Sequence, residues 1–550
     1  MEKNKNAKPK NAVNMFFSGV IILTVANVLV KSVGLISKIV LNTVVGSEGA
    51  GYYSSAYEIY AFLYIIATSG LPVALSIMVS RCRAQGRIKE ARKIFNIAIV
   101  MFLIIGGLFA TLMIAFSGSI ANFISAPETA ICIVAVAPTI LFICLSSCLR
   151  GFFQGYQLMK PTGISQFLEA MGKVLVGVGF AFWARAQGYE DHVVAAFTIL
   201  GVTSGVFFGM VYLFIKKLFF KDKSYYEMDV LEVEPTVKST KSILKELLVI
   251  AIPITLSSCV LSLTIIIDTF MVQSRLLASG MSEDLVRVYY GDYTTLVISI
   301  INLPTILMYP IANALVPLIT GAITTKDHKR AENMRGFSLR VINMISIPCA
   351  LGIGIFSRNI LDLMMFTEGS VNRAAPWLSV GAVSVIFLGL ISVTNAFLNT
   401  SGKQKYPIIS MLCGSGVKIL ANYILLKEIG IYGAPISTVL CYLAAATLNI
   451  FFTVKHVGRL PDIKKVFGMP LLCAVSSIGF SAILYLLLDF ILPMKIATII
   501  CILLAIFVYL FMIIRTKTVM EYELLMLPHG EKLVCLLKKM RFFPKNVKNR

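Results

Sequence analysis

The stretch GISQFLEAMGKVLVGVGFAFW, residues 163–183, decides the kind of fold that this chain can adopt. As a helix it is long enough to cross about 30 Å of hydrocarbon, yet it carries Glu169 and Lys173 near its middle. A charged side chain at the centre of a membrane-spanning helix costs about 2.5–3.5 kcal/mol. We therefore expect a membrane protein whose task needs charged groups at that depth.

The whole chain has the composition of an integral membrane protein. Its 550 residues are 57% hydrophobic and only 14% charged, whereas soluble domains are about 25% charged. The basic N-terminal segment leads directly into a long apolar run without a signal-peptide cleavage site. The sequence shows no phosphate-binding loop, no nucleophile motif and no metal-ligand spacing among its eleven cysteines and four histidines. It therefore predicts no cofactor and no metal, and indicates neither an enzyme nor an ATP-driven pump.

Fourteen apolar segments are long enough to span the membrane as helices. They lie at 15–45, 51–80, 94–116, 129–149, 161–183, 193–215, 247–273, 293–320, 339–357, 377–399, 406–426, 431–454, 467–491 and 494–514. With the N-terminus inside, the cytoplasmic segments hold 39 of the 50 lysines and arginines, and the outer loops hold 7. This asymmetry predicts a multi-pass protein of the cell membrane with both termini in the cytoplasm.

The net charge of +22 follows mainly from these cytoplasmic segments, which also favour contact with anionic membrane lipids. We do not expect nucleic-acid binding. The C-terminal residues 516–550 mix apolar and basic side chains, a pattern typical of a helix that lies on the inner membrane surface.

A weak internal repeat relates two parts of the chain. Segment 74–91 matches 314–331 at several positions at an offset of 240, and Lys173 matches Lys418 at an offset of 245. Because six spans per repeat give both halves the same orientation, we predict an all-α polytopic fold with two six-helix lobes in parallel repeat around a central cavity, plus two C-terminal helices. The predicted parts are a first lobe at 1–215, a cytoplasmic connector at 216–246, a second lobe at 247–455, the last two spans at 456–515 and the tail at 516–550.

Charged residues inside the predicted spans mark the candidate site. They are Lys31, Lys38, Lys173 and Lys418, with the carboxylates Glu58, Glu169 and Asp268. Glu169 and Lys173 have the i, i+4 spacing of an ion pair, and structural pairing between helices is one interpretation of these charges. Lys31 and Lys418 have no acid close in sequence, so we expect them to face a water-filled cavity. An excess of lysines favours an anionic substrate, because an ammonium binds phosphate as a point charge.

Several motifs resemble one group of membrane transporters. SGLPVALSIMVSRCRAQGRIKEARKIF (69–95), LRGFFQGYQLMKPTGISQFLEAMGKVLVG (149–177) and NALVPLITGAITTKDHKRAENM (313–334) resemble the stage V sporulation protein B group, which is related to the MurJ-type lipid II flippases. That group belongs to the multidrug/oligosaccharidyl-lipid/polysaccharide exporter superfamily. The resemblance covers nearly the whole chain, and the RGFFQG…KPT…SQ…E block is its most specific part.

This resemblance implies a monomeric flippase that works by alternating access. Its substrate would be an undecaprenyl-diphosphate-linked sugar precursor, with peptidoglycan lipid II as the leading candidate, moved from the inner to the outer leaflet. In MurJ-type proteins, basic residues of a first-span S-R-x-x-G-F-x-R pattern line the cavity. Here Lys31 occupies the first basic position, and Lys38 lies one residue beyond the second.

We accordingly expect the intramembrane lysines to bind the diphosphate, with Lys38 in support of Lys31, Lys173 and Lys418. The three carboxylates are expected to tune these lysines or to couple transport to Na⁺, H⁺ or the membrane potential. Other functions stay open: a flippase for another lipid-linked polysaccharide, a cation-coupled multidrug exporter of the same fold, and a membrane scaffold for wall synthesis. An exporter of cationic drugs would be expected to show carboxylates in excess of lysines, and a scaffold would tolerate loss of those lysines.

Overall fold

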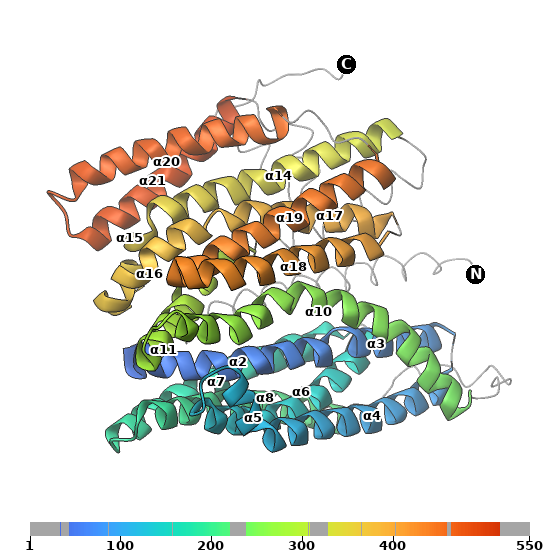
Figure 1. The fold of residues 1–550 in the computed structure, drawn as a ribbon. Helices are drawn as coiled ribbons and strands as arrows, with labels where there is room; N and C mark the ends of the chain where they lie inside the picture. The colour runs from blue at the N-terminus through green and yellow to red at the C-terminus, as the bar shows by residue number, and fades with distance from the viewer. Residues whose placement is uncertain are drawn as a thin grey trace. The chain divides into compact units, whose positions relative to one another are not determined.

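The computed structural model is helical, with no β-strand in the part of the chain that it describes (Figure 1). The described residues are 34, 43–85, 87–156, 158–220, 238–305, 307–308, 328–364, 366–401, 403–458 and 464–516. The predicted all-α class is confirmed for these residues.

The chain divides into two compact units. Unit 1 comprises Met1–Thr295 with Asn422–Ala434, and unit 2 comprises Leu296–Ala421 with Pro435–Arg550. The two predicted six-helix lobes and their boundaries stay predictions. Residues 221–237 of the predicted connector and 517–550 of the predicted tail lie outside the described residues.

Unit 1 is built from long helices that pack side by side. In chain order its helices are α2 (Gly46–Thr68), α3 (Gly70–Ala84), α4 (Ile88–Ala115), α5 (Ser117–Phe123), α6 (Thr129–Gly155), α7 (Met159–Ala186), α8 (Asp191–Leu218), α10 (Thr240–Ala278) and α11 (Glu283–Asp292). Helix α8 packs along α7 and α6, and α6 also packs along α4. Helix α10 packs along α2 and α3, as Figure 1 shows.

Unit 2 continues from the π-helix η1 (Tyr293–Ile298), which begins in unit 1. Its helices are α12 (Ser299–Asn302), α14 (His328–Ile355), α15 (Ser357–Leu363), α16 (Glu368–Gly381), α17 (Ser384–Thr400), α18 (Lys405–Glu428), α19 (Gly433–His456), α20 (Met469–Leu488) and α21 (Met494–Arg515), with the short helix η3 (Lys464–Gly468). The short helix η2 (Gly430–Tyr432), between α18 and α19, belongs to unit 1. The last residues of α18, from Asn422, belong to unit 1. Helices α20 and α21 pair with each other and pack against α14 and α15 (Figure 1).

Ten helices among the described residues are long and apolar enough to cross a membrane, or eleven if the bent pair Glu368–Gly381 and Ser384–Asn399 forms one span. They correspond to predicted spans 2–6 and 9–14. Predicted span 7 lies within α10. Most of span 1 and the second half of span 8 lie outside the described residues, so the count of fourteen stays a prediction.

Glycines let α7 and α8 pack with their backbones in contact. A Cβ atom built on Gly205 would lie 2.3 Å from the carbonyl oxygen of Glu169 and 2.7 Å from the amide nitrogen of Lys173. One built on Gly201 would lie 2.4 Å from Gly177. Helices in lipid associate through close packing of small residues, since lipid tails are as apolar as leucine. This glycine contact fixes the part of α7 that carries Glu169 and Lys173.

We predict that Gly205→Leu separates α7 from α8 and lowers the free energy of unfolding by about 2 kcal/mol, the usual cost of overpacking. Thermal unfolding of the purified protein in detergent measures the change. Gly179→Leu is the matched control, because a Cβ atom there meets nothing within 4 Å. Equal unfolding midpoints for the two variants would contradict the proposed packing role.

Candidate functional site

Glu169 and Lys173 face away from the exposed apolar surface of α7. Phe167 and Leu175 are 40% and 65% exposed. At 100° per residue they lie about 120–160° around the helix from Lys173. The two charged side chains are only partly exposed. They therefore lie on a polar face that is separate from the surface suited to lipid.

The partner of Glu169 is Arg150 of α6. Its Nη2 donates to Oε2 of Glu169 at 2.8 Å, and its Nε donates to the hydroxyl of Ser165 at 3.0 Å. The expected i, i+4 ion pair with Lys173 is not formed in the described structure. The predicted span 129–149 placed Arg150 in a loop, but α6 continues to Gly155 and buries it. The sequence analysis missed Arg150 because an apolar window ends at the first charge, whereas a helix does not.

Lys173 lies instead on an aromatic ring. Its ammonium is 4.2 Å from the ring centroid of Tyr57 on α2, a cation–π contact. Such a contact partly offsets the cost of holding an ammonium between helices. It also leaves Lys173 without a carboxylate that fully neutralises it, as far as the described contacts show.

Four tyrosines form one face of α2, which we call the tyrosine face: Tyr53, Tyr57, Tyr60 and Tyr64. Their spacing of i, i+4, i+7 and i+11 aligns them along the helix. Consecutive ring centroids are 5.7, 5.7 and 5.9 Å apart. Tyr53 and Tyr60 are buried, whereas Tyr57 and Tyr64 are partly exposed. The spacing was visible in YYSSAYEIYAFLY (52–64), although the sequence analysis looked only for charges in this segment.

The carboxylates Glu58 and Asp268 belong to a buried polar layer of unit 1. Asp268 on α10 accepts hydrogen bonds from Nδ2 of Asn422 at 3.0 Å and from the hydroxyl of Tyr293 at 3.4 Å. Glu58 on α2 is buried, and both carboxylates lie within electrostatic reach of Tyr290. Tyr293 begins the π-helix η1, a kind of turn that is frequent at functional sites.

Lys418 belongs to unit 2 and is 1% exposed. Its ammonium donates to the hydroxyl of Thr438 on α19 at 2.9 Å. The structure thus places this lysine in an enclosed polar site rather than on an open surface. Lys31 and Lys38 lie outside the described residues. Within the part that is described, no group of three His, Cys, Asp or Glu side chains could hold a metal ion.

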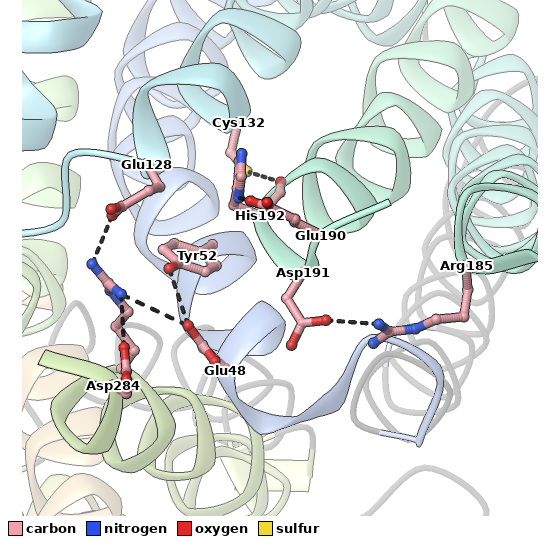
Figure 2. Close-up of polar contacts among 10 residues, drawn as sticks. Glu48, Tyr52, Glu128, Cys132, Arg185, Glu190, Asp191, His192 and Asp284 are labelled. Carbon is pink, nitrogen blue, oxygen red and sulfur yellow. Dashed lines mark hydrogen bonds and ion pairs between the residues drawn. The ribbon is translucent and has the colours of Figure 1, made fainter. Parts of the chain in front are cut away.

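One end of unit 1 is closed by a group of ion pairs that we call the Arg287 cluster: Arg287, Glu48, Glu128, Glu283 and Asp284. Glu48, Glu128 and Asp284 surround one guanidinium in Figure 2. Arg287 of α11 is 2.8 Å from Glu128, which precedes α6, and 3.7 Å from Glu48 of α2. Three parts of the chain are thereby joined through one buried cation.

Glycines bring α2 and α11 together beneath this cluster. A Cβ atom on Gly291 would lie 2.2 Å from the carbonyl oxygen of Ser47. Close by, Arg185 pairs with Asp191 at 2.7 Å (Figure 2). Arg185 also donates to the carbonyl oxygen of Val45 at 2.9 Å. The predicted outer loops 46–50, 117–128, 184–192 and 274–292 therefore meet at one end of unit 1.

The predicted cytoplasmic segments meet through other contacts. Arg81 of α3 pairs with Glu246 of α10 at 2.8 Å, and Lys93 of α4 donates to the carbonyl oxygen of Lys238. A 2.7 Å hydrogen bond from the Lys238 ammonium lowers the pKa of the Glu246 carboxyl. Loops predicted to share a side of the membrane are therefore found together at both ends.

Unit 2 holds an apolar cavity of about 460 Å³. It lies between α14, α15, α20 and α21, and its lining includes Pro348, Phe356, Ile478, Ile506 and Tyr509. Its walls are almost entirely apolar, so a hydrocarbon chain can pack there without burying an unpaired polar group.

Two family descriptions match the sequence. "Polysaccharide biosynthesis protein" matches residues 16–323, and "MatE" matches residues 292–424. Among curated relatives, the Lipid II flippase MurJ of Bacillus subtilis (strain 168) is 25% identical over 85% of this chain and 88% of its own. Stage V sporulation protein B of the same organism is 24% identical over 82% of this chain and 84% of its own.

Solved structures show the same fold. An inward-facing multidrug resistance MATE family transporter of the MOP superfamily superposes with a TM-score of 0.65 at 16% identity, covering 78% of this chain and 94% of that one. The Lipid II flippase MurJ in its inward closed conformation gives 0.62 at 17% identity, covering 90% and 98%. The chain therefore has the fold of multi-pass membrane transporters, as the resemblance implied.

We predict that Arg150→Met lowers the free energy of unfolding by about 2 kcal/mol, because it leaves the Glu169 carboxylate without its cation; partial exposure of Glu169 keeps the loss below that of a fully buried pair. The double variant with Glu169→Gln should recover most of the loss. Arg81→Met is the control, since its exposed pair contributes about 0–1 kcal/mol. Thermal unfolding in detergent compares the wild type, both single variants, the double variant and Arg81→Met, and additive losses in the double variant would contradict the coupling.

Proposed function

We propose that this chain, which belongs to the polysaccharide biosynthesis protein family, is a flippase for a polyprenyl-diphosphate-linked saccharide. The peptidoglycan precursor lipid II is the leading candidate, and another lipid-linked polysaccharide is the alternative. The protein moves its substrate from the inner to the outer leaflet of the cell membrane by alternating access, with both termini in the cytoplasm.

The observation that carries this proposal is the partly exposed cationic group at Lys173. Arg150 is paired with Glu169, whereas Lys173 rests on Tyr57, on a face that is separate from the exposed apolar side of α7. The partly exposed ammonium of Lys173 favours an anionic headgroup, and diphosphate is a strong partner for an ammonium. The match to the Lipid II flippase over most of both chains supports the same substrate class.

We propose that the diphosphate is bound by Lys31, Lys38, Lys173 and Lys418. Of these, Lys173 can meet a ligand as the structure stands, whereas Lys418 would have to leave Thr438 first. Glu58 and Asp268 are candidates for coupling to Na⁺ or H⁺, and Glu169 tunes the charge of Lys173 and Arg150. The membrane potential is the other driving force we consider.

The other partners follow from the substrate and the membrane. The apolar cavity of unit 2 suits part of the prenyl chain. The basic tail 516–550 would contact anionic lipids. We assign no cofactor and no nucleic acid, and we propose that one copy of the chain carries out transport.

Export of cationic drugs is the second candidate, because a MATE family transporter has the same fold. An exporter of cationic drugs would be expected to bind them with carboxylates that have no cation beside them. Here, however, Glu169 is already paired with Arg150, and the accessible charge beside it is the Lys173 ammonium on Tyr57. We therefore place drug export second, and a drug-resistance assay in the expressing strain tests it directly.

Replacing Lys173 by Ala should abolish rescue of bacteria depleted of their own lipid II flippase, whereas the wild-type chain restores growth. Loss of a charge-assisted contact to phosphate is expected to slow transport at least about tenfold. Lys31→Ala and Lys418→Ala are tested alongside. Lys160→Ala is the matched control, since it lies at the exposed start of the same helix as Lys173.

Two results would change the assignment. A well-expressed wild-type chain that restores no growth would exclude lipid II and move the substrate to another lipid-linked saccharide. Full rescue by each lysine variant would exclude the diphosphate role and favour a scaffold.

The Arg287 cluster yields a second test of alternating access. We propose that opening at this end separates α11 from α2 and Glu128. Arg287→Gln, which removes the cation shared by four carboxylates, then weakens the closed state. A loss of about 1.4 kcal/mol from that state shifts the conformational equilibrium tenfold. We predict impaired rescue in Arg287→Gln and partial recovery when Glu128→Gln is added, measured at equal expression. A double variant no better than the single one would contradict this.

A further inference from the structure

The tyrosine face and Lys173 combine two recognition chemistries at one place. Tyr57 and Tyr64 are partly exposed and offer flat rings with hydroxyl groups, and the ammonium of Lys173 lies 4.2 Å above the Tyr57 ring. The ring contacts continue without a break from Tyr53 to Tyr64. A surface that only faced lipid would need neither a lysine nor the nearby Arg150–Glu169 pair.

The local charges decide which ligand fits these rings. A cationic ligand would be attracted by aromatic faces but repelled by the Lys173 ammonium, whereas the charge of Arg150 is already paired with Glu169. A saccharide avoids this conflict, because a pyranose ring has an apolar C–H face that stacks on an aromatic ring and hydroxyl groups that bond to tyrosine and carboxylate oxygens. Among ligand classes, a neutral or anionic sugar matches the face best.

We propose that Tyr57 is a specificity residue for the saccharide: its ring exchanges the Lys173 ammonium for the first sugar of the substrate. In the structure the Lys173 ammonium covers the Tyr57 ring. A diphosphate binds an ammonium more strongly than an aromatic face does. When the diphosphate draws Lys173 away, the ring of Tyr57 becomes free to stack on the first sugar. This inference rests on the proposed flippase function and adds how the carrier distinguishes a loaded lipid from an unloaded one.

The exchange explains why a lysine should lie against a tyrosine ring at this place. Before substrate arrives, each satisfies the other, so neither an ammonium nor a polar aromatic ring is left bare between helices. After the diphosphate binds, the loss of the cation–π contact is compensated only if a sugar covers the ring. A polyprenyl diphosphate without sugar therefore binds more weakly than one that carries it.

The test measures equilibrium binding to the full chain in nanodiscs. The two probes are undecaprenyl diphosphate and lipid II, which share the lipid and the diphosphate and differ in the disaccharide-peptide. The variants are Tyr57→Leu, which removes the ring, Tyr57→Phe, which keeps the ring without its hydroxyl, and Lys173→Met. Tyr423→Leu is the matched control, because Tyr423 also carries a cation–π contact, with Arg275 at 3.4 Å, and lies elsewhere in unit 1.

The expected result is that wild-type protein prefers lipid II and that Tyr57→Leu loses about tenfold in affinity for lipid II, the size of one lost stacking contact. The same variant should bind undecaprenyl diphosphate at least as tightly as wild type does, because it has no Lys173–Tyr57 contact to break. Tyr57→Phe should keep the preference, Lys173→Met should weaken both probes, and Tyr423→Leu should change neither. Unfolding midpoints confirm that each variant is folded.

Two outcomes would overturn the inference. If Tyr57→Leu weakens both probes equally, the ring only positions Lys173; if it weakens neither, the ring does not meet the substrate. In both cases binding of lipid II by the wild type would leave the flippase proposal standing. Binding of neither probe by the wild type would refute the flippase for lipid II itself, and with it the exchange.

Discussion

The cost of placing charge between helices in hydrocarbon is the constraint on which the rest of this structure depends. Arg150, Glu169 and Lys173 lie on α6 and α7, two helices long and apolar enough to cross a membrane, and an unpaired ion within such a span is strongly disfavoured. The fold meets this cost in two ways: Arg150 and Glu169 neutralise each other, and Lys173 rests on an aromatic ring. Both solutions need α2, α6 and α7 to be held at fixed distances.

Glycines hold these helices at fixed distances. The contact of Gly205 with the backbone of α7 brings two helices closer than any side chain would permit. With α7 fixed from behind by α8, its charged face is directed toward α6 and α2. A similar glycine contact at Gly291 brings α11 against α2, beneath the Arg287 cluster. Small residues thus set the geometry, and charged residues use it.

The lysines in the two units differ in their exposure, and therefore in their access to a ligand. Lys173 is partly exposed and is held by a contact that a stronger anionic partner can displace. Lys418 is enclosed and bound to Thr438, so it takes part only after local movement. The sequence pattern matches Lys173 with Lys418 at an offset of 245, yet the two lysines have different environments, because each environment depends on the side chains of the neighbouring helices.

The all-helical membrane fold follows from the residue pattern, because apolar segments of this length satisfy their backbone hydrogen bonds in lipid by forming helices. The residue pattern also determined which loops share a side, since basic residues mark one side and the contacts at both ends of unit 1 agree with that division. Only the tertiary structure decided which charges pair. Glu169 was expected to meet Lys173, four residues away on its own helix, but it meets Arg150 of α6 instead. The reason is physical: periodicity reports the face on which a side chain lies, whereas its partner depends on the neighbouring helix and on how closely that helix can approach.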